Sequence, residues 1–271
     1  MKNVHKAQMI TIMLAVTAAV MADEPIEGKG IYAICRPSYD AELSFPVPGT
    51  VAEIHVKEGD KVEKGDLLVS LDTKVENARL EQLKAEADSK IQIDAAKARL
   101  EQAKSDLEKI SKAAEGGAAS EREVEHARLD VKINELSLQL AGFEHEQNRR
   151  KYREVKQQIE RMKLKSDVRG LVESIHVEIG EAVTTQENRI ARIVVIDPLR
   201  IDSPVPVALA EKLKPGGKAT VTITGRNVRL KGNIVHVSRI AEAASNTVRV
   251  RIEVPNPQGH KAGQQVRVTF P

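Results

Sequence analysis

Two stretches of the chain carry apolar residues at alternating spacings of three and four, which places them on one side of a helix. The first runs from Thr73 to Ala114 and the second from Ser120 to Lys163, and neither contains proline. This spacing is a heptad seam and predicts two antiparallel helices packed as a coiled coil. The seam residues are Leu80, Leu83, Ala87, Ile93, Ala96, Leu100, Ala103, Leu107, Ile110 and Ala114 in the first stretch, then Val124, Ala127, Val131, Asn134, Leu138, Ala141, His145, Asn148, Tyr152, Val155, Ile159 and Met162 in the second.

The two stretches have nearly equal lengths of 42 and 44 residues, so the hairpin is expected to return to its starting point. At about 1.5 Å per residue, each arm reaches roughly 60 to 65 Å. The seam of the first helix changes phase near Lys90, which indicates local unwinding or overwinding. The segment 115–119 contains Gly116 and Gly117 and ends the first helix, and Ser120 with Glu123 forms a capping box for the second.

A second apolar stripe runs along the second helix beside its seam: Leu129, Ile133, Leu136, Leu140 and Phe143. A two-helix hairpin buries one seam per helix, so this stripe needs another explanation. It is either part of a wide seam or the surface on which neighbouring copies pack into a tube.

The hairpin separates two copies of an internal repeat. Residues 49–62 align without gaps on residues 170–183, and seven of the fourteen positions are identical. Each copy reads as a β-branched strand, a glycine turn and a second strand, with Gly59 and Gly180 expected to adopt positive φ. Gly49 and Gly170 are the other glycines that we assign to these turn units. Two such units make one pseudo-symmetric β-sandwich, because neither can bury its apolar face alone, and this resembles the lipoyl/biotinyl-carrier fold.

The last third of the chain alternates in the manner of short strands separated by turn residues. Strands are expected at 219–224, 232–238, 246–254 and 265–270, with a short helical turn at 208–213. These strands predict a small β-barrel, to which residues 31–46 add a strand or two.

The predicted fold is therefore an α+β multidomain protein. It consists of a split lipoyl-like β-sandwich with an inserted antiparallel α-helical coiled-coil hairpin, plus a small antiparallel β-barrel. The expected divisions are a signal peptide at 1–22, N-terminal strands of the barrel at 23–46, the half-sandwich 47–72, the hairpin 73–164, the second half-sandwich 165–196 and the barrel 197–271.

The N-terminus and the composition indicate an exported protein. Lys2 and Lys6 precede a stretch of about 14 apolar residues and a small-residue cleavage site at Ala22. That stretch is shorter than the ~20 residues that span a bilayer, although an uncleaved anchor remains the alternative. Cys35 is the only cysteine, so no internal disulfide forms, and we interpret it as a small buried hydrophobe. Lys and Arg nearly balance Asp and Glu, 42 against 39, which argues against nucleic acid as a partner.

The order of these units resembles the HlyD-type membrane fusion proteins, the periplasmic adaptors of efflux and type I secretion systems. The resemblance covers about residues 41–270 and is carried by the segment 48–72, by Gly170-Leu-Val with Gly180-Glu, and by Asp197-Pro-Leu with Thr247-Val-Arg-Val and Asn256-Pro. It implies a periplasmic, peripheral protein that forms a homo-oligomeric ring, binds an inner-membrane transporter of unknown class and contacts an outer-membrane duct with the hairpin tip.

The family's tip pattern of Arg, Leu and Ser falls on Lys109, Ala113 and Ser120, so only the serine is kept. With Gly116 and Gly117 these residues form the candidate docking tip. Because Ala cannot fill a pocket made for Leu, and Lys cannot make the bidentate bonds of Arg, docking to a typical duct is in question. Ser120 also has the simpler role of a helix N-cap.

Other readings of the chain predict different chemistry. Lys74 resembles the lysine of a lipoyl or biotinyl carrier, yet here it opens a long helix instead of a tight turn. A structural coiled-coil protein without a transporter is a further alternative. His55 and His176 occupy equivalent repeat positions but lack a third ligand at metal-binding spacing, and His145 with Asn148 fits register-setting polar positions in the seam. No catalytic motif is found, so we expect no enzymatic activity, no cofactor and no metal.

Overall fold

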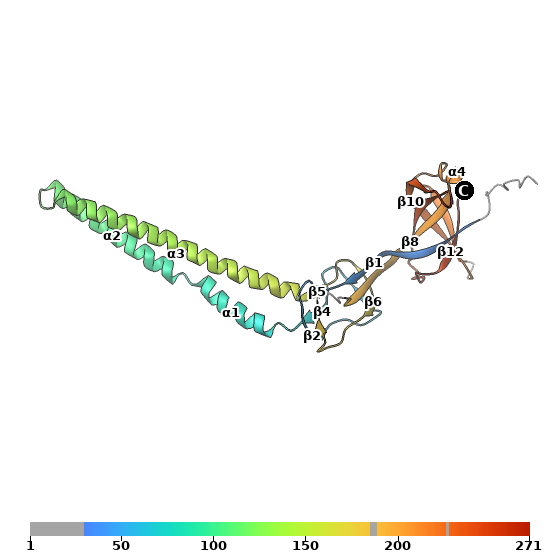
Figure 1. Ribbon diagram of the computed structural model, residues 1–271, viewed down its shortest axis with the longest axis horizontal. Coiled ribbons are helices and arrows are strands. Elements are labelled where there is room, and N and C mark those ends of the chain that lie inside the picture. The colour runs from blue at the N-terminus through green and yellow to red at the C-terminus, as the bar shows by residue number, and fades with distance from the viewer. Residues whose placement is uncertain (1–29, 185–188, 226–227) are drawn as a thin grey trace, which may run out of the picture.

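The molecule is elongated, with a helical hairpin at one end, a β-sandwich in the middle and a β-barrel at the other end (Figure 1). The computed structural model describes residues 30–184, 189–225 and 228–271. The expected signal peptide, residues 1–22, lies outside the described residues, as do positions 23–29 of the expected N-terminal barrel segment.

The hairpin consists of α1 (Lys74–Asp88), α2 (Ile91–Glu115) and α3 (Glu121–Arg161). The prediction of one continuous first helix was wrong, because Ser89 adopts an extended backbone and separates α1 from α2. This break lies where the seam changes phase, so the chain restores its register by interrupting the helix rather than by rewinding it. The predicted seam is confirmed, and its buried members are Leu83, Ala87, Ala96, Leu100, Ala127, Ala141, Val155, Ile159 and Met162.

The two repeat copies fold against each other into a single sandwich. Its strands are β2 (Gly49–Ile54), β3 (Lys61–Val62), β4 (Leu67–Leu71), β5 (Lys163–Lys165), β6 (Gly170–Ile175), β7 (Ala182–Val183) and the start of β8 (Ala191–Pro206). Strand β2 of the first copy pairs with β7 of the second, and β3 pairs with β6. The shared core includes Phe45, Val51, Leu68, Leu71, Val172, Val183, Ile190 and Ile193.

Hydrogen bonds across the sandwich repeat the internal symmetry of the sequence. The Gly59 N–H donates to the Val172 carbonyl at 2.8 Å, and the equivalent Gly180 N–H donates to the Val51 carbonyl at 2.9 Å. Both glycines have positive φ, 91° and 89°, as predicted. Each turn is thus held by a backbone bond to the opposite repeat, so one copy alone leaves these groups unpaired.

Gly49 and Gly170 do not lie in turns, which corrects their assignment. Each is the first residue of a strand, β2 or β6. A Cβ atom on Gly49 would approach a Leu71 methyl group at 2.9 Å, and one on Gly170 would approach the Val194 carbonyl oxygen at 2.8 Å. These glycines permit close packing between strands, rather than an unusual backbone angle.

Among the described residues, the barrel closes through strands in the order β1, β12, β9, β10, β11 and β8, with β8 pairing back to β1. These are β1 (Ile31–Leu43), β9 (Lys218–Ile223), β10 (Val228–Glu242), β11 (Thr247–Val254), β12 (Gln265–Thr269) and β8, with the short α4 (Val207–Ala210) after β8. All four strands expected in the last third are present, and their inward side chains form the barrel core. Cys35 is 1% exposed in that core, which confirms its interpretation as a buried residue.

Two long strands join the barrel to the sandwich. β1 pairs with β12 over Ile31–Ile34 and with β8 over Cys35–Leu43, so both β1 and β8 run from one domain into the other (Figure 1). Arg192 on β8 donates two hydrogen bonds of 2.7 Å to the Asp40 carboxylate on β1, and this contact lowers the pKa of Asp40. Asn256, 2% exposed, donates its backbone N–H to Asp197 and its side-chain amide to the carbonyl of Ile196. The junction is therefore ordered by paired backbone and bidentate contacts, not by a loose linker.

Candidate interaction surfaces

The hairpin tip is a compact turn closed by backbone hydrogen bonds. Gly117 has φ 78°, its N–H donates to Ala114, and the next N–H, of Ala118, donates to Ala113 at 2.7 Å. This pair of bonds closes α2 in a Schellman motif, which explains why glycine stands at this position. Gly116 has an ordinary φ of −82° and serves as the C-cap of α2.

Ser120 caps the other side of the turn. Its side chain accepts a hydrogen bond from the Glu123 N–H, while the Glu123 carboxylate accepts one from the Ser120 N–H at 2.6 Å. The predicted capping box is confirmed, and these contacts lower the pKa of Glu123. The serine hydroxyl is therefore engaged in helix capping within the chain.

Lys109 and Ala113 lie on α2 below this turn. The exposed Lys109 ammonium lies 3.5 Å from the Asp106 carboxylate. The side chains of Lys109 and Asp106 line a groove of about 630 Å³ between α2 and α3, whose other walls include Ala103, Ile110, Ala127, Asp130 and Asn134. Lys109 therefore brings its charge to a groove, whereas Ala113 supports the turn through its carbonyl.

The second apolar stripe of α3 is exposed along its whole length. The exposed fractions are 56% for Leu129, 50% for Ile133, 52% for Leu136, 58% for Leu140 and 61% for Phe143. The explanation as a wide seam is wrong, because a wide seam would be covered by α2. These residues stand two and five positions after seam residues and therefore lie on the face of α3 turned away from its partner helix.

The remaining sequence candidates do not converge on a catalytic or metal centre. The Nε2 atom of His55 lies 3.2 Å from the Ser70 hydroxyl, and that of His176 lies 3.0 Å from the Ser174 hydroxyl. Across residues 30–184, 189–225 and 228–271, no group of three or more His, Cys, Asp or Glu side chains is arranged to hold a metal ion. Lys74 is the first residue of α1, and its backbone N–H donates to Asp72. The lysine therefore lacks the hairpin apex that a carrier lysine requires.

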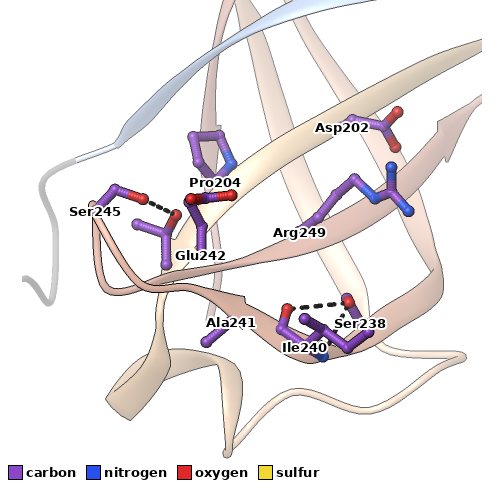
Figure 2. A pocket seen from close by; sticks show the side chains of 9 residues that line it. Asp202, Pro204, Ser238, Ile240, Ala241, Glu242, Ser245 and Arg249 are labelled. Atoms are coloured by element: carbon purple, nitrogen blue, oxygen red, sulfur yellow. Dashed lines mark hydrogen bonds between the residues drawn. The ribbon is translucent and has the colours of Figure 1, made fainter.

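Sequence reasoning missed a pocket of about 620 Å³ on the barrel surface (Figure 2). A register irregularity in β10 between Val237 and Ala241 turns Ile240 outward until it is 81% exposed. The Ser238 hydroxyl accepts a hydrogen bond from the Ile240 N–H and stabilises this bulge. The strand expected at 232–238 ends before this bulge is complete, so the alternation of polar and apolar residues did not predict it.

This pocket carries charge on both sides, with Asp202 and Arg249 on one side and Glu242 on the other (Figure 2). Asp202 accepts hydrogen bonds from Arg251 at 2.8 and 3.1 Å, which lowers the pKa of its carboxyl group, and Arg249 extends toward it from the same strand (Figure 2). Ser245 and Thr247 share a hydrogen bond of 2.9 Å on the opposite wall. The pocket thus combines one exposed isoleucine with a partly neutralised ionic cluster, a composition suited to contact with another protein.

Within the described part of the chain, no helix is long and apolar enough to cross a membrane.

Comparison with known proteins accounts for both β-domains. Residues 45–196 match the family model for the YknX barrel-sandwich hybrid domain, and residues 201–271 match that for the CusB-like beta-barrel domain. The first match includes the hairpin and covers more than half of the chain.

Individual relatives extend over most of the chain. Nodulation protein NolF of Rhizobium meliloti (strain 1021) is 29% identical over 245 residues, which are 90% of this chain and 63% of NolF. The chain thus spans less than two thirds of the length of this relative. The crystal structure of MacA from Actinobacillus actinomycetemcomitans superposes with a TM-score of 0.77 at 21% identity, covering 88% of this chain and 76% of MacA. The structure of the membrane fusion protein Spr0693 from Streptococcus pneumoniae R6 superposes with a TM-score of 0.59 at 15% identity, covering 89% of this chain and 97% of Spr0693.

Proposed function

Because the chain belongs to the membrane fusion proteins, the periplasmic adaptor family that carries a YknX-type barrel-sandwich hybrid domain, we propose that it links an inner-membrane transporter to an outer-membrane duct. It acts as an oligomeric scaffold for efflux or secretion and catalyses no reaction of its own. Residues 1–22 direct it to the periplasm as a cleavable signal peptide, and it stays peripheral to the inner membrane. The observation that carries this proposal is the stalk. A hairpin about 60 Å long projects from a sandwich that two distant repeats close.

The exposed stripe on α3 supports assembly with further copies of the chain. The groove below the tip is lined by Ala103 and Ile110 of α2 together with Asn134 and Ala127 of α3. These shared lining residues show which parts of the two antiparallel helices lie opposite each other along the hairpin axis. The stripe therefore stands level with the middle of α2. At the equivalent outward positions of α2, two and five residues after its seam residues, stand Ala95, Ala98, Gln102 and Ser105.

Bulky side chains on one face, and mainly small ones (Ala95, Ala98 and Ser105) at the same height on another face, suit a head-to-tail interface. In a closed ring, copies keep the same height, so the α3 stripe of one protomer meets the α2 face of the next. Large residues then enter the space that alanine and serine leave free. We take this as the contact that builds the stalk tube.

The tip and the barrel are the two outward-facing ends of such a scaffold. The tip, with Lys109, Ala113 and Ser120, contacts the duct, and the barrel, with the bulge at Ile240, contacts the transporter. Since the tip keeps only the serine of the family's pattern, the duct surface that it meets differs from the typical one.

Photo-cross-linking in cells tests these contacts. A photoreactive residue replaces Ala113 at the tip or Ile240 on the barrel, and adducts are identified by mass spectrometry. We expect an outer-membrane protein from position 113 and an inner-membrane protein from position 240. Glu101, exposed on the side of α2, is the matched control and should give neither.

The outcomes separate the adaptor from its alternatives. Adducts with copies of the same chain alone at both positions would indicate a structural coiled-coil protein and overturn the proposal. An added lipoyl or biotinyl mass on Lys74 in the purified mature protein would point to a carrier instead.

A further inference from the structure

The charges of the chain are segregated between its two β-domains. The barrel segment 197–271 contains 12 Lys and Arg against 5 Asp and Glu, an excess of seven positive charges. The sandwich segments 47–72 and 165–196 contain 7 against 11, an excess of four negative charges. The small net charge of the whole chain therefore conceals a strongly basic domain at one end.

One side of the barrel holds basic residues and no acidic ones. It is formed by Ile31–Ile34 of β1, by β12, by β9, and by the first six residues of β10, segments that contain no Asp or Glu. Cross-strand partners share a face, so the pairing registers identify the outward side chains. They are Tyr32, Arg267, Thr222 and Arg229 in one row, Thr269, Thr220 and Lys231 in the next, and Lys218 and Asn233 in a third. We call this set the basic face.

The basic face presents its cations without internal neutralisation. Arg267 donates to the Tyr32 hydroxyl at 2.8 Å and its guanidinium lies 5.2 Å from the centre of the Tyr32 ring, while Lys218 donates to Asn233 at 2.7 Å. All of these partners are neutral. Arg229 and Lys231 are exposed and, among the described residues, form no ion pair. Four cations and three threonine hydroxyls are thus available to a ligand that carries several negative charges.

Exposed apolar side chains border the cations. Tyr32 and Ile34 are each 52% exposed on the outward side of β1. Tyrosine beside basic residues is typical of the interface between water and a bilayer, because its apolar ring can enter the headgroup region while its hydroxyl stays hydrated. β1 also enters the barrel at this edge, since Ile31 pairs with Val268.

We propose that the basic face binds the phosphate headgroups of anionic lipids and so holds the barrel against a membrane surface. A lipid surface offers many phosphates in one plane together with an apolar layer. That combination matches dispersed cations next to Tyr32 and Ile34 better than a single soluble phosphate does. This contact goes beyond the adaptor function and does not require a transporter.

Vesicle sedimentation with the mature chain tests the proposal. We expect binding to vesicles that contain phosphatidylglycerol, weak binding to pure phosphatidylcholine vesicles, and loss of binding in high salt. The double variant Arg229→Gln/Lys231→Gln should lower the partition coefficient about 25-fold, because each basic residue near an anionic surface contributes about fivefold. Both side chains are exposed, so thermal unfolding should stay unchanged.

The matched control removes two positive charges from the stalk, in Lys97→Gln/Lys104→Gln. Binding within twofold of the unmodified chain is expected for this control. Equal loss in both variants would show a general charge effect and overturn the proposal, as would binding that does not depend on phosphatidylglycerol. Full competition by millimolar inorganic phosphate at constant ionic strength would assign the face to a soluble anion instead. A photoreactive residue at position 231 that labels protein and no lipid in cells would assign it to an acidic protein partner.

Discussion

The sandwich and the tip-proximal half of the hairpin use bulky apolar residues in opposite ways. In the sandwich, large side chains fill the core, with Leu68 at 0% and Phe45 at 1% exposure. In the tip-proximal half of α3, the buried residues are Ala127 and Ala141, while the five leucine, isoleucine and phenylalanine residues of the stripe are exposed. The comparison indicates that the sandwich completes its core within one chain, whereas the stalk keeps its largest apolar surface for a partner.

The largest effect is expected from opening the sandwich core. Leu68→Ala removes a fully buried side chain and should lower the free energy of unfolding by about 2–5 kcal/mol. The matched change on the stripe, Leu136→Ala, should alter the stability of the isolated chain by about 0.5 kcal/mol or less. Urea unfolding at low protein concentration measures both. Similar losses for the two variants would remove the contrast between the regions.

The second largest effect is expected on the self-association of the chain through the stripe on α3. Leu136→Gln/Leu140→Gln keeps good helix formers but removes two apolar side chains, each contributing about 1.5–3 kcal/mol if buried by a neighbour. We expect association to weaken by at least about 100-fold, measured by sedimentation velocity. Lys151→Gln/Glu154→Gln, on α3 outside the stripe, is the control and should assemble normally. A chain that remains monomeric before any substitution would contradict the assignment of the stripe.

A smaller effect is expected at the tip. Ser120→Ala removes the capping box of α3 and should cost about 1 kcal/mol of stability. Ser105→Ala, in the interior of α2, makes the same chemical change without removing a cap and should be neutral or slightly stabilising. Thermal unfolding of the two variants checks the difference. If Ser120→Ala also abolished cross-linking at position 113 while stability was unchanged, the hydroxyl would be a docking group rather than a cap.

The smallest effect should appear where the stalk meets the sandwich. Glu160 accepts hydrogen bonds from Lys163 at 2.7 Å and Lys165 at 2.9 Å, which lower its pKa to about 2. A depressed carboxyl pKa stabilises the fold above the ordinary value near 4.5, and this stabilisation is lost as the pH falls toward 2. Because Glu160 is 42% exposed, solvent screening limits the contribution to below about 1 kcal/mol.

Glu160→Gln should therefore unfold more easily than the unmodified chain at neutral pH. The difference in stability between the two proteins should shrink as the pH falls from 4.5 to 2. Thermal unfolding across this range measures the gap. Glu81→Gln, an exposed change on α1 without an ion pair among the described residues, should show no such trend. A gap that is constant with pH would mean that the ion pairs contribute nothing.

The fold was predictable where the pattern is periodic or repeated. Heptad spacing predicted the stalk, and the match of residues 49–62 with 170–183 predicted the closed sandwich. The roles of Gly49 and Gly170 were not predictable, because close packing between strands depends on neighbours distant in sequence. The break at Ser89 was visible only as a phase change, since spacing alone does not distinguish an overwound helix from an interrupted one.

The interaction surfaces were predictable to a lesser degree. The three-residue spacing of Ser120 and Glu123 predicts the capping box. The stripe on α3 follows from the same helical periodicity as the seam. The bulge at Ile240 and the basic face depend on strand register, which joins residues such as Tyr32 and Arg267 that are 235 positions apart. Local sequence patterns carry no such information.

The most direct test of the account is the accessibility of the stripe in the assembled protein. Leu136→Cys places one thiol on it, and the native Cys35 is buried and should remain unlabelled. We predict rapid maleimide labelling of the dilute, dissociated chain and strong protection of the same thiol in intact cells. Equally rapid labelling in both states would show that no neighbour covers α3 and would contradict the proposed assembly.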